Sequence, residues 1–392
     1  MISKRIQSIE ESSTLAMAKK SRELVYKGKK IINLSLGQPD FNTPNFIKKA
    51  AKKAINENYS MYTPVPGYKE LQKTISKKFK RDNNLNYSEQ QIVCSTGAKQ
   101  SLMQLFLTIL NPGDEIIICA PYWVSYYQMI KFAKANPIVI KTNIDDDFKI
   151  TTEQLKKNIS KKTKAFLINS PCNPSGAVYS KKELKELASV LKKHPNTIVI
   201  SDEIYEHINF TKEKNYSIGE FLSTKKQVVT INGLSKGFAM TGWRLGYLGA
   251  PIDIANGCTK IQGQFTSGAC SITQRAAITA LNEKPDFTKK MNEKFKSRRD
   301  MAIKYLSNIP NLKFKIPDGA FYIFIDFSFY FKKSKIENND NLSMFLLKNA
   351  EVATVSGSAF GDKNCIRISI ASSKKELKSA ILRIKKALKK LT

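Results

Sequence analysis

One lysine in the stretch 228–249, VVTINGLSKGFAMTGWRLGYLG, lies where an amine could do chemistry. An apolar, strand-like run ends at an Asn-Gly pair, and Ser235 and Lys236 follow among small and apolar neighbours. A lysine held away from water loses part of its preference for the charged form and becomes a usable nucleophile. Arg244, a few positions further on, carries the planar fork that suits a phosphate. An amine beside a phosphate clamp suggests a phosphorylated aldehyde cofactor, of which pyridoxal phosphate is the common one.

Composition leaves an alternative open, because a lysine in so basic a chain could equally be a solvated surface residue. The 392 residues carry a formal net charge of +32, which also raises the possibility of a nucleic-acid partner. However, the basic residues are spread along the whole chain and alternate with acidic and apolar ones, as in KKELKELASVLKK at 181–193. That pattern is typical of solvated helix faces, and aromatic residues that could stack on bases do not interleave with it. We therefore expect no nucleic-acid partner.

The cysteines and the N-terminus indicate a compartment. Six cysteines are scattered without a C-x-x-C pair, and only two histidines accompany them, so we expect no metal site. The N-terminus, MISKRIQSIEESS, has no apolar signal region, and no apolar run reaches the ~20 residues that span a bilayer. We expect a cytoplasmic protein with reduced thiols and no membrane partner.

Strand-like and helical patterns alternate from residue 91 onward. The strand-like runs are apolar throughout instead of alternating with polar residues, which is typical of strands covered on both faces. They lie at 91–95, 115–120, 137–140, 164–170, 197–202, 228–232 and 243–250. Helices are predicted at 2–28, 46–56, 69–82 and 274–305. The pattern predicts an α/β fold with a mostly parallel sheet flanked by helices, followed by a smaller α+β unit.

Polar residues follow the predicted strands at their carboxyl ends, where open α/β sheets bind ligands. Gly97, Ala98 and Lys99 open a helix after the first strand, so their N–H groups could cradle a phosphate. Trp123 follows the second strand, and its indole could stack on a heteroaromatic ring. Each feature alone also fits an ordinary turn or core residue.

Two later strands end in further candidates. Asn173 could donate its amide to a ring oxygen, and Asp202 and Tyr205 follow the next strand. A carboxylate at the end of an apolar strand is costly unless it meets a positive partner, either a protonated pyridine nitrogen or a structural lysine or arginine. Because such signals recur at successive strand ends, together they favour a cofactor site.

Motifs that run from about Ser12 to Ser369 resemble those of fold type I pyridoxal-phosphate enzymes. Among these, the chain is similar to class I aminotransferases, and most of all to the bacterial aspartate/prephenate aminotransferases. The motifs, in chain order, are SLGQPDF, YTPVPGYKEL, STGAKQ, PYWVSY, NSPCNPSGAVY, SDEIYEH, SKGFAMTGWRLGY, GAFY and CIRIS. The resemblance implies a seven-stranded sheet in a large domain at 46–290 and a small C-terminal domain at 291–392. Residues 1–45 would form an N-terminal arm and part of the small domain.

The resemblance also implies how a cofactor would be held. Lys236 would carry pyridoxal 5'-phosphate covalently and move the proton at the substrate Cα, and Asp202 would keep the ring nitrogen protonated. Tyr205 and Asn173 would donate to the phenolic oxygen, and Trp123 would stack on the ring.

The phosphate site implied by the resemblance draws on two subunits. Its members are Gly97, Ala98, Lys99, Ser235, Arg244 and, from the neighbouring subunit, Tyr62. The implied assembly is a homodimer with shared active sites.

The implied substrate site consists of Gly37, Trp123, Asn173, Arg367, Lys99 and Thr14. Arg367 would grip the α-carboxylate through two hydrogen bonds, and Lys99 and Thr14 match the positions that the bacterial subgroup uses for the substrate side chain. Two features depart from some relatives. First, no arginine aligns with the one that some relatives use for the distal carboxylate, since Arg275 is expected on a helix face. Second, Gly233 stands where some relatives have a phosphate-binding serine.

The resemblance implies transfer of the amino group of L-aspartate to 2-oxoglutarate by a ping-pong mechanism. Three alternatives stay open: a prephenate or broad-specificity aminotransferase, a C–S lyase on the same fold, and a nucleic-acid-binding protein suggested by the charge.

Overall fold

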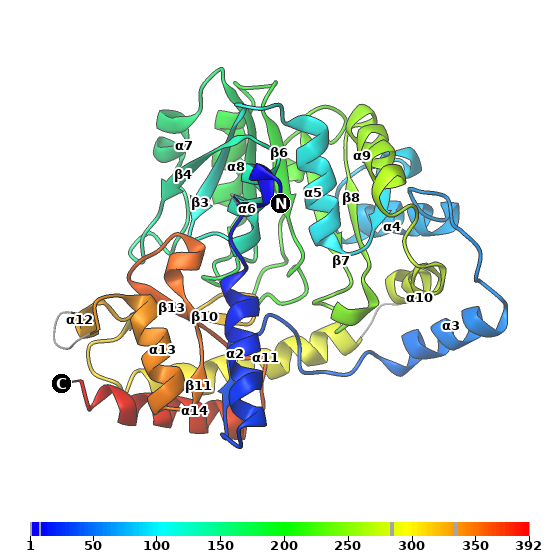
Figure 1. Cartoon of the computed structure of the whole chain (residues 1–392). Coiled ribbons are helices and arrows are strands. Elements are labelled where there is room, and N and C mark those ends of the chain that lie inside the picture. The colour runs from blue at the N-terminus through cyan, green and yellow to red at the C-terminus, as the bar shows by residue number, and fades with distance from the viewer. Residues whose placement is uncertain (1, 8, 283–285, 332–335, 392) are drawn as a thin grey trace.

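The computed structural model describes residues 2–7, 9–282, 286–331 and 336–391. A large sheet with helices on both faces forms one part, and a smaller sheet with its own helices forms the other (Figure 1). In the described ranges, no helix is both long and apolar enough to cross a membrane.

The large sheet contains seven strands in the order β2-β8-β7-β6-β5-β3-β4. Strand β8 is antiparallel to both of its neighbours, and the other pairs are parallel. The predicted mostly parallel sheet is therefore confirmed. The strands are β2 (Ile92–Ser95), β3 (Glu115–Ala120), β4 (Asn136–Lys141), β5 (Thr163–Asn169), β6 (Ile198–Asp202), β7 (Val228–Gly233) and β8 (Gly246–Gly249).

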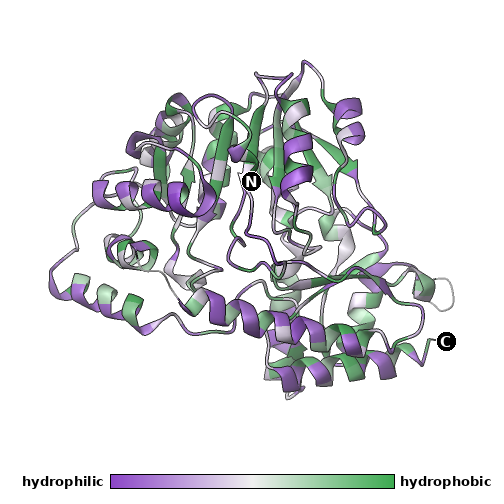
Figure 2. Ribbon diagram, turned by 180° about the vertical axis from the view of Figure 1, so that it is seen from behind, coloured by the Kyte–Doolittle hydropathy of each residue, from purple (hydrophilic) through white to green (hydrophobic). Residues whose placement is uncertain are grey.

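These strands are apolar throughout because each supplies side chains to two cores. Along β3, Ile116 and Ile118 join a core with helices on one face of the sheet, whereas Ile117 joins a core with helices on the other face. The first face is covered by α5 (Ala98–Ile109), α6 (Val124–Phe132) and α9 (Ile252–Phe265), and the second by α7 (Thr152–Asn158) and α8 (Lys181–Leu191). Figure 2 shows the hydrophobic residues gathered in the sheet and the hydrophilic ones along the outer helices.

A third core lies beside β2 and β8. It joins α3 (Asn45–Asn56), α4 (Lys69–Asn83) and α10 (Ser271–Asn282). The predicted helices at 46–56 and 69–82 are thus confirmed.

The smaller part is built around a four-stranded antiparallel sheet in the order β12-β13-β10-β9. Its strands are β9 (Lys313–Phe314), β10 (Tyr322–Asp326), β12 (Val355–Ser356) and β13 (Cys365–Ser369). Its helices are α11 (Asp286–Leu306), α12 (Ser328–Phe331), α13 (Asn339–Asn349) and α14 (Lys374–Leu388). The N-terminal strand β1 (Ile32–Asn33) pairs in parallel with β11 (Val352–Ala353). This pairing attaches the N-terminal segment to the C-terminal part of the chain.

The N-terminus differs from the single helix predicted at 2–28. The structure has α1 (Lys4–Gln7) and α2 (Ser13–Tyr26), with residues 9–12 outside any helix, and residue 8 lies outside the described ranges. Ser12 is extended and precedes α2. Serine competes with the helix backbone for hydrogen bonds, so it favours a helix start over a helix interior. The prediction of helix at 274–305 is confirmed in α10 and α11, while residues 283–285 lie outside the described ranges.

Candidate active site

A cavity of about 340 Å³ collects most of the predicted site residues. It lies at the carboxyl ends of strands in the large sheet and is closed by residues of the N-terminal arm and of β13. The predicted residues that line it are Thr14, Gly37, Ala98, Lys99, Trp123, Asn173, Asp202, Tyr205, Ser235, Lys236, Arg244 and Arg367. Residues far apart in the sequence are thus brought together at one site.

Lys236 lies in the loop that follows β7. Its Nζ donates to the carbonyl of Gly37 at 2.6 Å and lies 5.8 Å from the centre of the Tyr205 ring. Burial, together with the nearby charges of Arg367 and Arg244, lowers the pKa of this amine to about 8. Lys236 is therefore not one of the ordinary solvated lysines, and a larger fraction of its amine is neutral near physiological pH than of a solvated lysine.

Asp202 ends β6 and is only 3% exposed. Tyr126 of α6 donates its hydroxyl to Oδ2 at 2.5 Å, and the backbone N–H of Ile204 donates to Oδ1 at 3.2 Å. Burial raises the pKa of the carboxyl, while both hydrogen bonds oppose that rise. No described lysine or arginine forms an ion pair with it, which disfavours the structural alternative to a protonated ring nitrogen.

Tyr126 was not predicted as a site residue. A signal was present, because it lies three positions after Trp123 and so on the same face of a helix.

Arg367 of β13 is 1% exposed and has no acidic partner among the described residues. Its Nη1 donates to Asn173 Oδ1 at 2.9 Å and its Nη2 to the carbonyl of Ser35 at 2.6 Å. Its guanidinium carbon lies 4.3 Å from the ring centre of Tyr322 and 4.9 Å from that of Phe360. The Nε atom is buried without a hydrogen-bond partner in the described part of the chain. A buried cation with an unused donor is suited to bind a carboxylate.

The start of α5 forms a positively charged corner of the cavity. Gly97 has a φ of 86°, and a Cβ at that position would lie 2.5 Å from Arg244 Nη2, so glycine is needed for this approach. Ala98 and Lys99 follow at the helix N-terminus, where unpaired N–H groups attract anions. Burial and the charge of Arg244 lower the pKa of Lys99. This corner could hold a phosphate, with Ser235 on the same cavity wall. Gly97 shapes the turn without lining the cavity itself.

Aromatic side chains form the remaining walls. Tyr205 shares a hydrogen bond of 2.9 Å with the hydroxyl of Tyr322, a residue that was not predicted although it lies in the GAFY motif. A Cβ on Gly37 would lie 2.7 Å from that hydroxyl, so a side chain at Gly37 would push Tyr322 away. Trp123 lies edge-to-face against Tyr126.

Tyr62, a predicted phosphate-site residue, does not line the cavity of its own chain. It is 95% exposed on the loop between α3 and α4. As expected, Arg275 is also outside the cavity lining, on α10, 3.9 Å from Glu70. Gly233 is buried, and a Cβ there would lie 2.9 Å from Gly246 Cα, so a serine could be accommodated only if β8 moved. The described residues contain no cluster of metal-ligating side chains.

Comparison with known proteins agrees with this geometry. The family model described as aminotransferase class I and II matches residues 29–384. A probable aspartate/prephenate aminotransferase of Rickettsia typhi is 44% identical over 393 residues, covering 99% of this chain and 98% of the relative. The bifunctional aspartate aminotransferase and glutamate/aspartate-prephenate aminotransferase of Petunia hybrida is 43% identical over 395 residues, covering 99% of this chain and 82% of the relative.

Solved structures match equally completely. The aspartate aminotransferase of Rhizobium meliloti superposes with a TM-score of 0.96 at 38% identity, over 99% of both chains. That of Thermus thermophilus, solved with maleate, superposes with a TM-score of 0.94 at 34% identity, also over 99% of both chains. With the family model, the relatives and the fold in agreement, this chain belongs to the class I and II aminotransferases.

Proposed function

We propose that this aminotransferase uses pyridoxal 5'-phosphate to transfer the amino group of L-aspartate to 2-oxoglutarate, in two half-reactions. The observation that carries the proposal is a single cavity that contains a half-buried amine of lowered pKa, Lys236, a buried carboxylate, Asp202, and a buried guanidinium, Arg367. The carboxylate and the guanidinium both lack an ion-pair partner among the described residues, as expected of groups that await a cofactor and a substrate.

The donor set fits the cofactor. Lys236 would hold the aldehyde carbon and Asp202 the protonated ring nitrogen, while Tyr205 and Asn173 would donate to the phenolic oxygen and Trp123 would stack on the ring. The positively charged corner would hold the phosphate through Gly97, Ala98, Lys99, Ser235 and Arg244. Pyridoxal phosphate, when bound, supplies an aldehyde that combines with amines and a ring that withdraws electrons from the amino acid.

The substrate would be held at both ends. Arg367 would bind the α-carboxylate, because its Nε is unused and its two other hydrogen bonds already fix the plane of the guanidinium. The neighbouring Gly37 carbonyl accepts from Lys236 and so holds the amine near that carboxylate. Lys99 and Thr14, on the same cavity, would contact the distal carboxylate. The Thermus relative was solved with maleate, a dicarboxylate of similar size.

Lys236 would move the proton. Its lowered pKa keeps part of the amine neutral, so it can take the proton from Cα of the amino acid and return it in the second half-reaction.

The proposal includes the assembly and the division into domains. Tyr62 is exposed and apart from the cavity of its own chain, which supports its placement in a partner's phosphate site and hence a homodimer. The pairing of β1 with β11 supports assigning the arm, residues 1–45, partly to the small domain at 291–392. Helix α11 runs continuously across residue 290 and would connect the small domain to the large domain at 46–290. All six cysteines are unpaired thiols, which supports a cytoplasmic location.

A second candidate is a prephenate or broad-specificity aminotransferase. A hollow of about 240 Å³ shares Lys99 and Val124 with the main cavity. It adds apolar side chains, among them Met103 and Met129, and also the carboxylate of Glu10. Apolar surface beside a cation would suit a carboxylate that carries a ring, and relatives are named for both substrates.

Borohydride reduction of the cofactor-loaded protein, followed by peptide mapping, tests the cofactor assignment. We expect the label on Lys236 and its loss in Lys236→Ala. An unlabelled Lys236, or full transamination by the variant, would overturn the proposal. A panel of aspartate, prephenate and aromatic donors then separates the two substrate candidates, and release of pyruvate and ammonia would indicate a lyase instead.

A further inference from the structure

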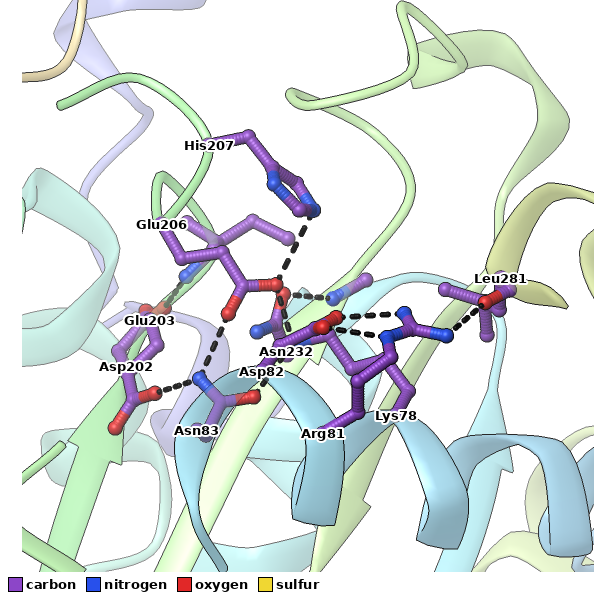
Figure 3. Close-up of polar contacts among 12 residues, drawn as sticks. Lys78, Arg81, Asp82, Asn83, Asp202, Glu203, Glu206, His207, Asn232 and Leu281 are labelled. Atoms are coloured by element: carbon purple, nitrogen blue, oxygen red, sulfur yellow. Dashed lines mark hydrogen bonds and ion pairs between the residues drawn. The ribbon is translucent and has the colours of Figure 1, made fainter. Parts of the chain in front are cut away.

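The loop that carries Lys236 rests on the turn that follows β6, at residues 203–207. Figure 3 shows this turn, with Glu206 and His207 above the side chains of α4. A Cβ on Gly237, the residue after Lys236, would lie 2.4 Å from Cδ2 and 3.0 Å from Cγ of His207. The imidazole therefore touches the loop backbone directly, and glycine is required for that approach.

The next residue of the loop makes a second contact with the same ring. Phe238 lies edge-to-face against the imidazole, with ring centres 5.4 Å apart and an angle of 83° between the planes. One side chain thus supports both residues that immediately follow Lys236.

His207 is in turn anchored by buried charges. Its Nε2 lies 3.4 Å from Glu206 Oε1, and Glu206 forms a buried ion pair with Lys78 of α4. Asn83 ties the cluster together, since its Nδ2 donates to Glu206 at 2.8 Å and to Glu203 at 3.0 Å, and its Oδ1 accepts from Lys78 at 2.7 Å (Figure 3). A network with this many mutual hydrogen bonds is rigid.

We propose that His207 is a positioning residue for Lys236: anchored by Glu206, its imidazole supports Gly237 and Phe238 and so fixes the reactive amine beside the Gly37 carbonyl. This inference rests on the proposed role of Lys236. It assigns to the final histidine of the SDEIYEH motif a role that the cofactor contacts do not require.

A hollow of about 480 Å³ lies behind the loop and is lined by His207 and Phe238, among other residues. Removal of the imidazole would join the space under Gly237 to this hollow. Water would then reach the loop from behind, and the amine would be less dehydrated and less well fixed.

The chain offers a direct test, because it contains only two histidines, His194 and His207. In protein labelled with ¹³C at the histidine Cε1 atoms, Lys236→Ala should shift the His207 resonance and its titration midpoint, and His194 should not respond. The groups that face His207 and contribute to this titration are Glu206, Lys78, Asp82 and Arg81. An unchanged His207 resonance would overturn the proposal.

Paired substitutions give a second test. Gly237→Ala should reduce Tm and slow cofactor loading, whereas Gly242→Ala, a control in the same loop with nothing within 4 Å of its Cβ position, should do neither. Adding His207→Ala to Gly237→Ala should restore part of the Tm and of the rate of cofactor loading, because it removes the imidazole atoms that clash with the new Cβ. If Gly237→Ala lowers Tm and slows loading equally in the presence and absence of the His207 imidazole, the proposed contact is wrong.

The reactivity of the amine provides a readout that a merely structural role would not move. In the apoprotein, His207→Ala should slow reductive methylation of Lys236 at pH 7 by about tenfold, since less of the amine is neutral. His207→Gln, which keeps a polar side chain beside Glu206 and fills much of the same space, should stay near the wild-type rate, and unchanged rates in both variants would overturn the proposal. If borohydride fails to label Lys236, the proposed function fails, yet the histidine resonance and the Gly237 pair still decide the contact.

Discussion

The hydroxyl of Tyr126 donates a hydrogen bond of 2.5 Å to Oδ2 of Asp202, and both residues are buried. Burial raises the pKa of this carboxyl, and the tyrosine opposes that rise by stabilising the ionised form. The carboxylate can therefore stay charged in an apolar strand end, ready for a positive partner.

Tyr126→Phe should weaken binding of pyridoxal phosphate about tenfold, because a hydrogen bond to a charged group contributes ~1.5 kcal/mol. Titration of the apoprotein, followed by cofactor absorbance, measures this. Tyr127→Phe is the matched control on the same helix, since Tyr127 stacks on Tyr122 and does not line the cavity. Equal affinity of wild type and Tyr126→Phe would refute the role of the hydroxyl.

Arg367→Lys should lower kcat/KM for aspartate by about 10- to 100-fold, mainly through KM, because a lysine cannot supply the paired donors of a guanidinium. Steady-state kinetics over a range of aspartate concentrations measures the effect. Arg383→Lys, at a half-buried position outside the cavity where the arginine contacts Glu351, should leave the kinetics unchanged. A normal KM in Arg367→Lys would place the α-carboxylate elsewhere.

Lys99→Ala should reduce kcat/KM for aspartate by about tenfold or more and leave that for a monocarboxylic donor such as alanine less affected, because alanine has no distal carboxylate for Lys99 to bind, whereas any loss at the phosphate would lower both values alike. The ratio of the two kcat/KM values is the measurement. An unchanged ratio would show that Lys99 does not select dicarboxylates.

Lys236→Met should stabilise the apoprotein at pH 7, and the gain should shrink as the pH rises. The folded pKa is about 8, against an ordinary value of 10.5. Below pH 8 the half-buried amine is charged in the folded protein, so the full cost of its partial dehydration is present. Between pH 8 and 10.5 the folded protein loses this proton, while the unfolded chain keeps it, and the cost disappears. Each pKa unit is worth ~1.4 kcal/mol, so the gain has an upper limit of about 3 kcal/mol. Thermal unfolding at pH 7 and pH 10 tests this, and a gain independent of pH would contradict it.

The stability of Glu203→Gln relative to wild type should increase as the pH rises from 4.5 to 7. Burial, with Glu206 nearby, raises the pKa of Glu203 from 4.5 to about 7. In that interval the unfolded chain ionises while the folded one keeps its proton, so wild-type stability falls with pH, whereas glutamine cannot ionise. Parallel Tm curves for the two proteins would rule this out. Glu186→Gln, on the exposed side of α8, serves as the surface control.

The sequence was most informative about features that short stretches of chain encode. The strands of the large sheet and the residues at their carboxyl ends could be predicted, because apolar runs and their polar ends are local patterns. The hydrogen bond from Tyr126 to Asp202 and the one between Tyr205 and Tyr322 could not be predicted, since they depend on how helices and strands from distant segments pack. The break before Ser13 was missed for a similar reason, because an apolar helical pattern continued through it.

Arg367 donates to the carbonyl of Ser35, 332 positions earlier in the chain, and Lys236 donates to that of Gly37, 199 positions earlier. In the order of synthesis, all strands of the large sheet and Lys236 therefore precede Arg367. A chain that ended before β13 would carry Lys236 without Arg367. The proposed site is complete only when β13 packs against the N-terminal arm, so transamination would report on chains that have folded from one end to the other.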